Sequence, residues 1–472
     1  MSLQPALPLL FDFLPDRPLV IETSEASLSS DAGLLPIRQL DEQLRFTQQL
    51  AAALDDPRDP RLVEHTTLEM LRARLYGILA GYEDQNDHDV LRSDAVFKLV
   101  AGRLPTDPDL ASQPTLSRFE NAVTIAALKR LRDVFIDQFI AAFADPPRHL
   151  LFDLDAVDDP AHGGQQLVLF HGYYEQYQYL PLVVTCADND RIVMVSLRHG
   201  SAHAALGADD DLEYLVRRLR AVWPGVSIEV RGDAGFGMPW MYDVCERLGL
   251  TYTFGLSSNP VLQERSDALL AGAIAQYEQT RQPQRLFDQF LYQAGSWPHA
   301  RQVLVKAEAN LHGTNRRFTV TNRAGAALYP EAAYDEYIQR GESENRNKEL
   351  KRGLDGDRLS DHRFLANYFR LYLHSAALNL LVHLRQRVAL PPLPAAAGER
   401  PAEPVAARRD RHNARRRRDP LGEGQPATWR LLLIKVAAEV IVRCRRVVVR
   451  LSASWPYVNY YRQVCQTVRG ET

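Results

Sequence analysis

The sequence predicts an α/β protein with a mixed-sheet core, a helical region before that core and a β-rich insertion within it. Three observations lead to this fold class. Apolar residues recur at helical spacing from about residue 37 to 145. Short strand-like runs then alternate with helical runs from 148 to 256. Between 257 and 331, alternating runs separated by turn residues indicate β structure before the helical period returns.

The bulk composition is that of a soluble globular protein. The chain has 472 residues, 46% of them apolar and 24% charged, so we expect two or three domains. No apolar run reaches the ~20 residues that a membrane span needs. The four cysteines are scattered without paired spacing, which indicates a reduced, cytosolic setting. The net charge of -3 gives no sign of nucleic-acid binding by itself.

The first third of the chain is predicted to be an arm followed by helices. Residues 1–36 are rich in Pro, Leu and Ser without a sustained period, and we expect an extended arm. Residues 37–147 are predicted to form a helical N-terminal region. Within it, Ser117 and Glu120 form a capping-box pattern before a long amphipathic run through Phe143.

The core is assigned to residues 148–256 and 332–388. The run at 191–198 is either a strand of its own or the continuation of the strand before it. We expect strands at 149–157, 166–171, 180–186, 191–198, 227–231 and 251–256, and helices at 210–222, 239–248 and 364–388.

The remaining segments are an insertion, a linker and a C-terminal piece. Residues 257–331 are expected to be mainly β, with a hairpin formed by 301–306 and 317–322. Residues 389–427 are rich in Pro, Ala, Gly and Arg and predict a disordered linker, whose arginines could add nonspecific phosphate affinity. The last piece is the C-terminal segment, 428–472. Within it, the sequence does not decide between helix and strand for residues 429–450.

The most informative motif is a stripe on one predicted helix. Tyr337, Arg340, Glu344 and Lys351 point within roughly 60° of one another at ~100° per residue. A carboxylate can hold a metal, and the two cations can hold phosphate oxygens. Few substrates other than a phosphodiester need both at once. The alternative is an exposed helix face, in which Arg340 and Glu344 form an (i, i+4) ion pair.

Acidic residues on two predicted strands complete this constellation. Asp153 and Asp155 share one face of the first strand, because alternate residues point the same way. Asp233 comes where a strand meets a Gly-rich turn, and ligands bind at such carboxyl ends in open α/β sheets. Three carboxylates can hold two hard divalent cations for an in-line displacement at phosphorus.

These residues carry a family resemblance. The chain resembles bacterial insertion-sequence transposases of the DDE type, in the group marked by a Tyr-Arg-Glu-Lys signature, which matches in full at Tyr337, Arg340, Glu344 and Lys351. The resemblance covers most of residues 37–388. Further matching segments are Asp153-Leu-Asp-Ala-Val-Asp-Asp-Pro160, Arg231-Gly-Asp-Ala-Gly-Phe236, Asp357-Arg-Leu-Ser360, Gln113-Pro-Thr-Leu-Ser-Arg-Phe-Glu120 and Val320-Thr-Asn322.

The resemblance implies an RNase H-like core and a role for each site residue. Asp155, Asp233 and Glu344 would bind metal, and Tyr337, Arg340 and Lys351 would contact phosphates at the DNA end. Asp155 is preferred to Asp153, but the family usually has Asp-x-Thr there and this chain has Val157, so the choice stays open. Trp297 is the candidate for stacking on a flipped base, although a Trp is more often a core residue.

The function implied by this resemblance is DNA transposition. The enzyme would use two Mg²⁺ or Mn²⁺ ions, nick DNA with water and then join DNA hydroxyls to target DNA. The helical region would recognise terminal inverted repeats, and synapsis implies a homodimer on DNA in a bacterial cytoplasm, associated with the nucleoid. One alternative is a metal-dependent nuclease that never joins strands, and nothing in the sequence distinguishes it from a transposase. The other is a domesticated DNA-binding protein without catalysis, against which the three intact acids argue.

Overall fold

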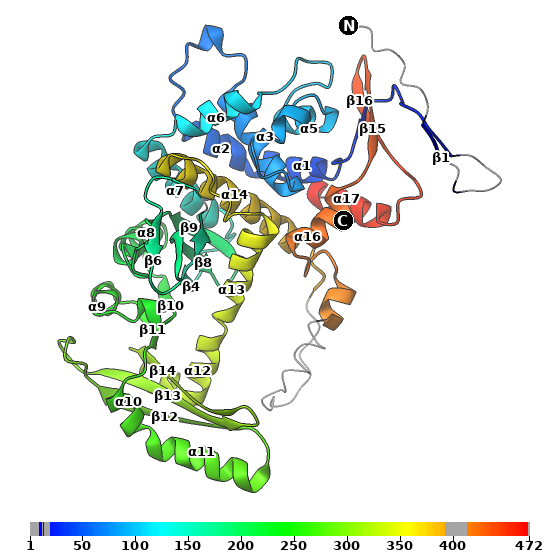
Figure 1. Ribbon diagram of the computed structural model, residues 1–472. Helices are drawn as coiled ribbons and strands as arrows, with labels where there is room; N and C mark the ends of the chain where they lie inside the picture. The colour runs from blue at the N-terminus through cyan, green and yellow to red at the C-terminus, as the bar shows by residue number, and fades with distance from the viewer. Residues whose placement is uncertain (1–8, 12, 14–18, 162, 392–412, 471–472) are drawn as a thin grey trace.

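The computed structural model describes residues 9–11, 13, 19–161, 163–391 and 413–470. Its centre is an eight-stranded mixed sheet with the order β12-β13-β14-β11-β10-β4-β8-β9 (Figure 1). The strands are β4 (His149–Ala156), β8 (Leu182–Cys186), β9 (Arg191–Ser196), β10 (Ser227–Gly232), β11 (Thr251–Leu256), β12 (Gln284–Tyr292), β13 (Arg301–Asn310) and β14 (Gly313–Thr321).

Strand direction changes once within the part of the sheet that carries the predicted acids. β4, β8 and β9 are antiparallel, whereas β10 and β11 run parallel to β4. The parallel pairs follow from the crossover helices α8 (Ala208–Val222) and α9 (Pro239–Arg247), because parallel neighbours need a long connection. The run at 191–198 is therefore a separate strand. The carboxyl ends of β4 and β10 meet at one edge, which is where the candidate site lies.

The two faces of this sheet differ in polarity. One face packs Phe152 and Val230 against α8 and α9 in an apolar cluster, as alternation in buried strands requires. The opposite face buries Asp153, Arg231 and Thr253 near β4, β10 and β11, while α14 (Phe364–Val388) packs apolar side chains over β9. The polar part of this face is the one that α12 (Pro330–Ile338) and α13 (Gly341–Lys348) cross.

The strands of the insertion belong to the central sheet. The three strands extend this sheet, because β14 pairs with β11 in antiparallel register, Thr253 opposite Thr321. The insertion also contains two helices, α10 (Pro260–Arg265) and α11 (Asp267–Thr280). The expected β-hairpin is present as β13 and β14. Figure 1 shows α11 along the outer end of this strand group.

The run predicted as a strand at 166–171 lies outside the central sheet. β6 (Leu169–His171) pairs with β7 (Gln176–Tyr179), which also pairs with β5 (Asp159–Pro160). An alternating pattern identifies a strand but not its partner, since pairing is set by residues distant in sequence.

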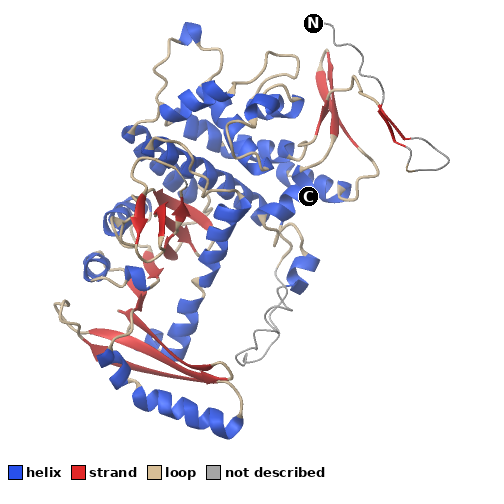
Figure 2. Cartoon of the chain, viewed as in Figure 1, coloured by secondary structure: helices blue, strands red, loops and turns tan. Residues whose placement is uncertain are grey.

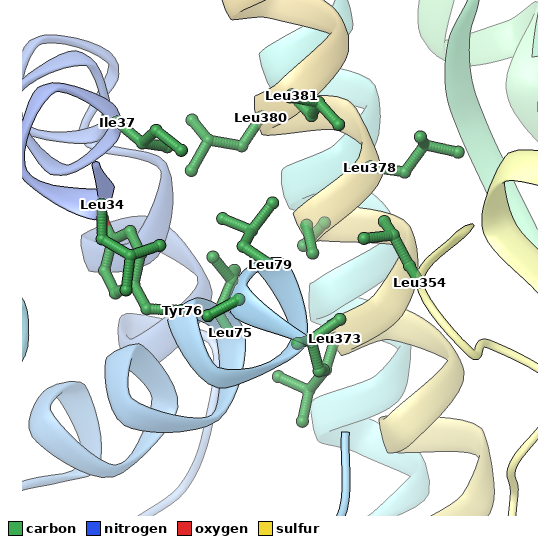
Figure 3. Packing of buried hydrophobic residues seen from close by; sticks show 14 of the residues in the cluster. Leu34, Ile37, Leu75, Tyr76, Leu79, Leu354, Leu373, Leu378, Leu380 and Leu381 are labelled. Atoms are coloured by element: carbon green, nitrogen blue, oxygen red, sulfur yellow. The ribbon is translucent and has the colours of Figure 1, made fainter. Parts of the chain in front are cut away.

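The helical region before the core shares one apolar cluster with α14 and with the C-terminal segment. Figure 3 shows the side chains where α1 (Leu34–Leu44), α3 (Thr67–Ala80) and α14 meet. Trp429 and Val464, from the end of the chain, are buried in the same cluster. The other helices of this region are α2 (Phe46–Ala52), α4 (His88–Leu91), α5 (Ala95–Ala101), α6 (Gln113–Asn121) and α7 (Ile125–Ile140).

The long helix expected from Ser117 onward is two helices, α6 and α7. Ser117 lies inside α6, and Thr124 caps α7 by accepting a hydrogen bond from a backbone N–H. Glu120 does not cap a helix. It is fully buried between Arg74 and Arg370, with N···O distances of 2.6 Å to each. These ion pairs tie α6 to α3 and α14, which explains a buried acid at that position.

The end of the chain forms a second small sheet. β15 (Ala438–Arg443) and β16 (Arg446–Leu451) make a hairpin, and β15 also pairs with β3 (Leu28–Ser29) from the N-terminal arm. This settles the open choice within 429–450 in favour of strands in its second half. Figure 2 shows this hairpin standing away from the helices. The chain ends with α17 (Val458–Arg469).

Both segments expected to lack regular structure are described in part. In the arm, β1 (Leu9–Phe11) pairs with β2 (Leu19–Ile21). In the predicted linker, residues 392–412 lie outside the described residues, and 413–418 are helical. Asp419 then accepts a hydrogen bond from the backbone N–H of Leu390 at 2.7 Å. This bond joins the described residues before and after the segment 392–412.

The structure also describes the cysteines and the apolar helices. All four cysteines are free. Among the described helices, none is long and apolar enough to cross a membrane.

Candidate active site

Asp155 lies near the end of β4, partly shielded by α13. Burial raises the pKa of its carboxyl to about 7. The Arg340 guanidinium lowers this pKa, whereas the nearby charges of Asp233 and Glu344 raise it. The Asp155 side chain keeps 13% of its exposure, so it can be reached from solvent. Asp155 is therefore a buried carboxyl with two acidic neighbours and one arginine beside it.

Asp233 follows the last residue of β10, next to Asp155. Gly232 pairs with Leu154 in the parallel register, which places Asp233 beside Asp155. One Asp233 carboxylate oxygen accepts a hydrogen bond from the backbone N–H of Gly235 at 2.8 Å. That bond caps a short 3₁₀ turn and fixes the side chain, as an Asp at such a turn commonly does.

The turn after Asp233 needs glycine because the backbone is crowded. A Cβ at Gly255 would lie 2.6 Å from the backbone nitrogen of Ala234, and one at Gly237 would lie 2.4 Å from the Gly255 carbonyl oxygen. The Gly-rich sequence thus lets the end of β11 approach the turn that presents Asp233.

Glu344 faces the two aspartates from α13, and Arg340 stands between them. Arg340 Nη2 lies 3.0 Å from Glu344 Oε1, and Arg340 Nη1 lies 3.7 Å from Asp155 Oδ2. The Glu344 side chain is 49% exposed, while that of Arg340 is 15% exposed. The (i, i+4) ion pair that the sequence left as an alternative is present, and it is directed at the acidic edge rather than at open solvent.

The segment from Tyr337 to Lys351 is not one uninterrupted helix. α12 ends at Ile338, α13 begins at Gly341, and the two are joined by (i, i+3) hydrogen bonds such as that from the Arg340 N–H to the Tyr337 carbonyl. A π-helical turn, Glu349–Gly353, follows. Gly341 is a weak helix former, and a 3₁₀ junction tightens the turn there.

The other two residues of the stripe contact the same edge separately. The Tyr337 hydroxyl donates to the carbonyl of Gly232 at 3.3 Å, and Gly232 directly precedes Asp233. Lys351 Nζ lies 2.9 Å from Asp158 Oδ1, just beyond β4. Tyr337 is thus tied to the end of β10, and Lys351 to the end of β4.

Asp153 is held by an arginine of the neighbouring strand. Arg231 binds it with both Nε and Nη2, at 2.7 and 2.8 Å. The side chains are 2% and 3% exposed. A third Arg231 nitrogen donates to the Glu336 carbonyl at 2.6 Å. All of this places Asp153 in a buried ion pair that attaches α12 to the sheet.

Two residues that the sequence reasoning did not single out contribute to the site. Asn347 donates an amide N–H to Asp155 Oδ2 at 2.6 Å, and it is buried. Asn347 comes three residues after Glu344 on the same helix, so helical spacing was a usable signal. Asp158, the partner of Lys351, gave no signal beyond a general acidic stretch.

A polar cavity of about 370 Å³ lies behind the site, under the junction of α12 and α13. Arg323 bridges Glu229 of β10 and Glu336 of α12 at its wall. Its other lining residues include Asp153, Arg231 and Ser343. These paired charges hold α12 and α13 against the polar face of the sheet.

The donor set suits a hard cation in its chemistry. Asp155, Asp233 and Glu344 offer carboxylate oxygens, the ligands that Mg²⁺ and Mn²⁺ prefer. Burial, and after it the charges of Asp233 and Glu344, raises the pKa of the Asp155 carboxyl, and a bound cation would offset both effects. Within the described ranges, no three His, Cys, Asp or Glu side chains are already grouped as metal ligands. Arg340 lies between two of the carboxylates, 3.7 Å from Asp155 Oδ2 and 3.0 Å from Glu344 Oε1.

Trp297 lies in the apolar cluster that covers one face of the central sheet. It is 6% exposed and makes edge contacts with Tyr242 and Tyr292 at ring-centroid distances of 5.3 and 5.4 Å. Arg301 stands 5.7 Å from its ring. A nucleobase could stack on this indole only after the ring is uncovered, and the stacking role of Trp297 stays a prediction.

Comparison with protein families places the chain among known proteins. A family model described as "Transposase DDE domain group 1" matches residues 11–396. The matched range includes every predicted site residue. No curated protein matches the chain.

Proposed function

Because the chain belongs to the transposase DDE domain group 1 family, we propose that it cleaves the ends of an insertion sequence and joins them to target DNA. The observation that carries this proposal is the convergence of three acids. Asp155 and Asp233 lie side by side on β4 and after β10, and Glu344 approaches them from α13. Members of this family typically use a divalent metal and act on DNA.

The order of strands supports the proposed RNase H-like assignment of the core. Three antiparallel strands, β9, β8 and β4, are followed by two parallel ones, β10 and β11. The two aspartates stand at the carboxyl ends of the central pair, where open sheets bind ligands. The acid from a later helix faces them across the polar side of the sheet.

Asp155, Asp233 and Glu344 would hold the metal, which we propose to be two Mg²⁺ or Mn²⁺ ions. When bound, such ions would activate the attacking oxygen and stabilise the leaving oxygen of an in-line displacement. The chain's own residues prepare the site. Gly235 and Asn347 fix two carboxylates through hydrogen bonds of 2.8 and 2.6 Å.

Arg340, Lys351 and Tyr337 would bind the phosphates of the DNA end. Both cations are ion-paired to carboxylates of this edge, Arg340 with Glu344 and Lys351 with Asp158. A DNA phosphate offers them a stronger, multidentate anionic partner, and Arg binds phosphate in a bidentate fork. Their transfer to phosphate would leave the carboxylates free to bind cations.

The reaction has two displacements at phosphorus. In the first, the oxygen of water attacks the scissile phosphorus, the bond to the 3′ oxygen breaks, and that oxygen leaves as a 3′-hydroxyl after taking a proton. In the second, the 3′-hydroxyl loses its proton and attacks a phosphorus of target DNA, which releases a new 3′-hydroxyl there. A terminal-repeat substrate and a homodimer that holds two ends are parts of the same proposal.

The test uses a labelled DNA end with Mg²⁺. The sequences flanking the coding region supply the candidate repeat. We expect cleavage and joining by the wild type, and a loss of at least about two orders of magnitude in both for Glu344→Gln, with DNA binding retained. Glu342→Gln is the matched control on the same helix. Cleavage that survives Glu344→Gln refutes the assignment, and cleavage without joining indicates a nuclease.

A further inference from the structure

Hairpin β15–β16 carries a cluster of arginines at its tip, which we call the basic tip: Arg443, Arg445 and Arg446. All three side chains are exposed. Within the described part of the chain, they have no hydrogen bond and no ion pair. Residues 441–450 contain four arginines and no acid, although the chain as a whole has a net charge of -3. The positive charge is therefore a local feature of this hairpin.

The residues at the tip do not stabilise the hairpin itself. Arg443 and Arg446 form the last cross-strand pair, and like charges directly opposite each other destabilise a hairpin. The two-residue turn between them is Cys444-Arg445, without the Gly or Asn that short hairpin turns prefer. Nearer the base, by contrast, Arg450 pairs with Glu439 at 3.3 Å. Positive charge is balanced at the base and left unbalanced at the tip.

The base of the hairpin is firmly attached to the helical region. The backbone N–H of Val440 donates to the Ser27 carbonyl at 2.8 Å, and β15 pairs with β3 over two residues. Lys435, just before β15, binds Asp31 at 2.7 Å. Ala438 and Val440 are buried. The hairpin thus starts from a fixed point.

The shaft between base and tip is apolar and regular. Its cross-strand pairs are Val440 with Val449, Ile441 with Val448 and Val442 with Val447. Such β-branched pairs favour an extended ribbon. The five steps from Ala438 to Arg443 span about 17 Å at ~3.3 Å per residue. Figures 1 and 2 show the ribbon projecting away from the helices.

We propose that the basic tip binds the phosphate backbone of duplex DNA, as an arm separate from the acidic site. The proposal rests on the DNA partner in the proposed function, but not on strand cleavage. Three guanidinium groups on a fixed ribbon match a polyanion, since Arg binds phosphate oxygens in a bidentate fork. A strand added from a second copy is disfavoured, because Arg446 and Arg450 stand on the free edge strand β16 and charged side chains discourage edge pairing.

The test is the salt dependence of binding to a random-sequence duplex in EDTA, so that no cleavage occurs. The hairpin variant changes Arg443, Arg445 and Arg446 to Gln. The control variant changes three arginines elsewhere to Gln and loses the same net charge. They are Arg58, Arg61 and Arg247, which are ion-paired with Asp56, Asp59 and Glu213; Arg61 and Arg247 are exposed and Arg58 is half-buried.

Each phosphate contact contributes about 0.9 to the slope of log K against log salt. We expect the slope to fall by about 2 to 3 in the hairpin variant, with affinity at ~0.1 M salt reduced tenfold or more, and to stay near wild type in the control. The single change Arg445→Gln, which lies in the turn, should lower the slope by about 1. It tests the proposal even if the triple variant fails to fold. A change to Lys at all three positions should keep the slope.

Several results would overturn the proposal. One is an equal loss in the hairpin and control variants, which would reflect net charge alone. A second is a hairpin variant whose salt slope for DNA is unchanged but which no longer binds vesicles containing anionic lipid. A third is a hairpin variant whose salt slope for DNA is unchanged but whose oligomeric state differs from that of the wild type. If the wild type binds DNA through the tip yet cleaves no DNA with Mg²⁺, the proposed function fails and this inference stands.

Discussion

Neutralising Asp153 and neutralising Asp155 should have opposite effects on stability, although the two acids are two residues apart. Asp153 forms a bidentate ion pair with Arg231, and both side chains are almost fully buried. Asp153→Asn leaves the Arg231 guanidinium buried and unpaired. We expect a loss of about 3–5 kcal/mol in the free energy of unfolding, as for other buried pairs that lose one partner.

Asp155→Asn should stabilise the protein instead. Burial, followed by the negative neighbours, raises the pKa of Asp155 from 3.8 to about 7. The unfolded chain therefore loses this proton first as the pH rises. Stability of the wild type falls between about pH 4 and 7, and above pH 7 the ionised form costs up to about 4 kcal/mol. Asn avoids that cost and still accepts the hydrogen bond from Asn347.

Urea unfolding followed by circular dichroism, from pH 4 to pH 8 without metal, measures both effects. The advantage of Asp155→Asn over the wild type should be near zero at pH 4 and largest at pH 8. Asp153→Leu combined with Arg231→Met should recover most of the stability lost in Asp153→Asn, because both buried charges are gone. A destabilising Asp155→Asn, or a neutral Asp153→Asn, would refute this reading of the two aspartates.

Three further predictions concern single side chains. Arg340→Gln should raise the affinity for Mn²⁺ without DNA by about tenfold, because it removes the guanidinium that competes with the metal for the carboxylates. Calorimetry measures this affinity, and an unchanged or weaker value would argue against the competition. Trp297→Ala should cost about 3–5 kcal/mol of stability while the folded protein still binds DNA; lost binding at full stability would place Trp297 in the interface. Glu120→Gln should lower the free energy of unfolding by about 3–5 kcal/mol, and with it the thermal midpoint, since it leaves Arg74 and Arg370 buried beside a neutral partner. A midpoint equal to that of the wild type would contradict the role of Glu120 in joining these helices.

Local signals predicted the elements of the core closely. Alternation located β10 and β11, and the apolar run from Phe364 to Val388 is α14. These patterns arise within one segment, because a strand or helix buries residues at its own period. The family match from residue 11 to 396 agrees with the transposase expectation.

Partners distant in the sequence could not be predicted. The pattern of β14 marks a strand, but only the folded chain pairs it with β11 and so joins the insertion to the central sheet. The ion pair of Asp153 depends on Arg231, 78 residues further along the chain. Alternation had placed both acids on one face and could say nothing about which one was paired.

The helix that carries the signature residues shows both the strength and the limit of helical spacing. Arg340 and Glu344 contact each other as an (i, i+4) pair should. Tyr337 and Lys351 also bind groups of the sheet, at the end of β10 and beyond β4, on a helix that a 3₁₀ junction and a π-helical turn interrupt. Spacing predicted the shared direction of the stripe but not these individual contacts.

The central claim is that Asp155, Asp233 and Glu344 form one metal site when DNA is bound. Anomalous diffraction from crystals of the protein with a terminal-repeat duplex and Mn²⁺ tests it directly, with Ca²⁺-soaked crystals as the control for the anomalous signal. We predict manganese peaks within ligand distance of all three carboxylates, with Arg340 moved from Asp155 to a DNA phosphate. Manganese bound elsewhere, or Arg340 still paired with Asp155 and Glu344 in the complex, would contradict the account.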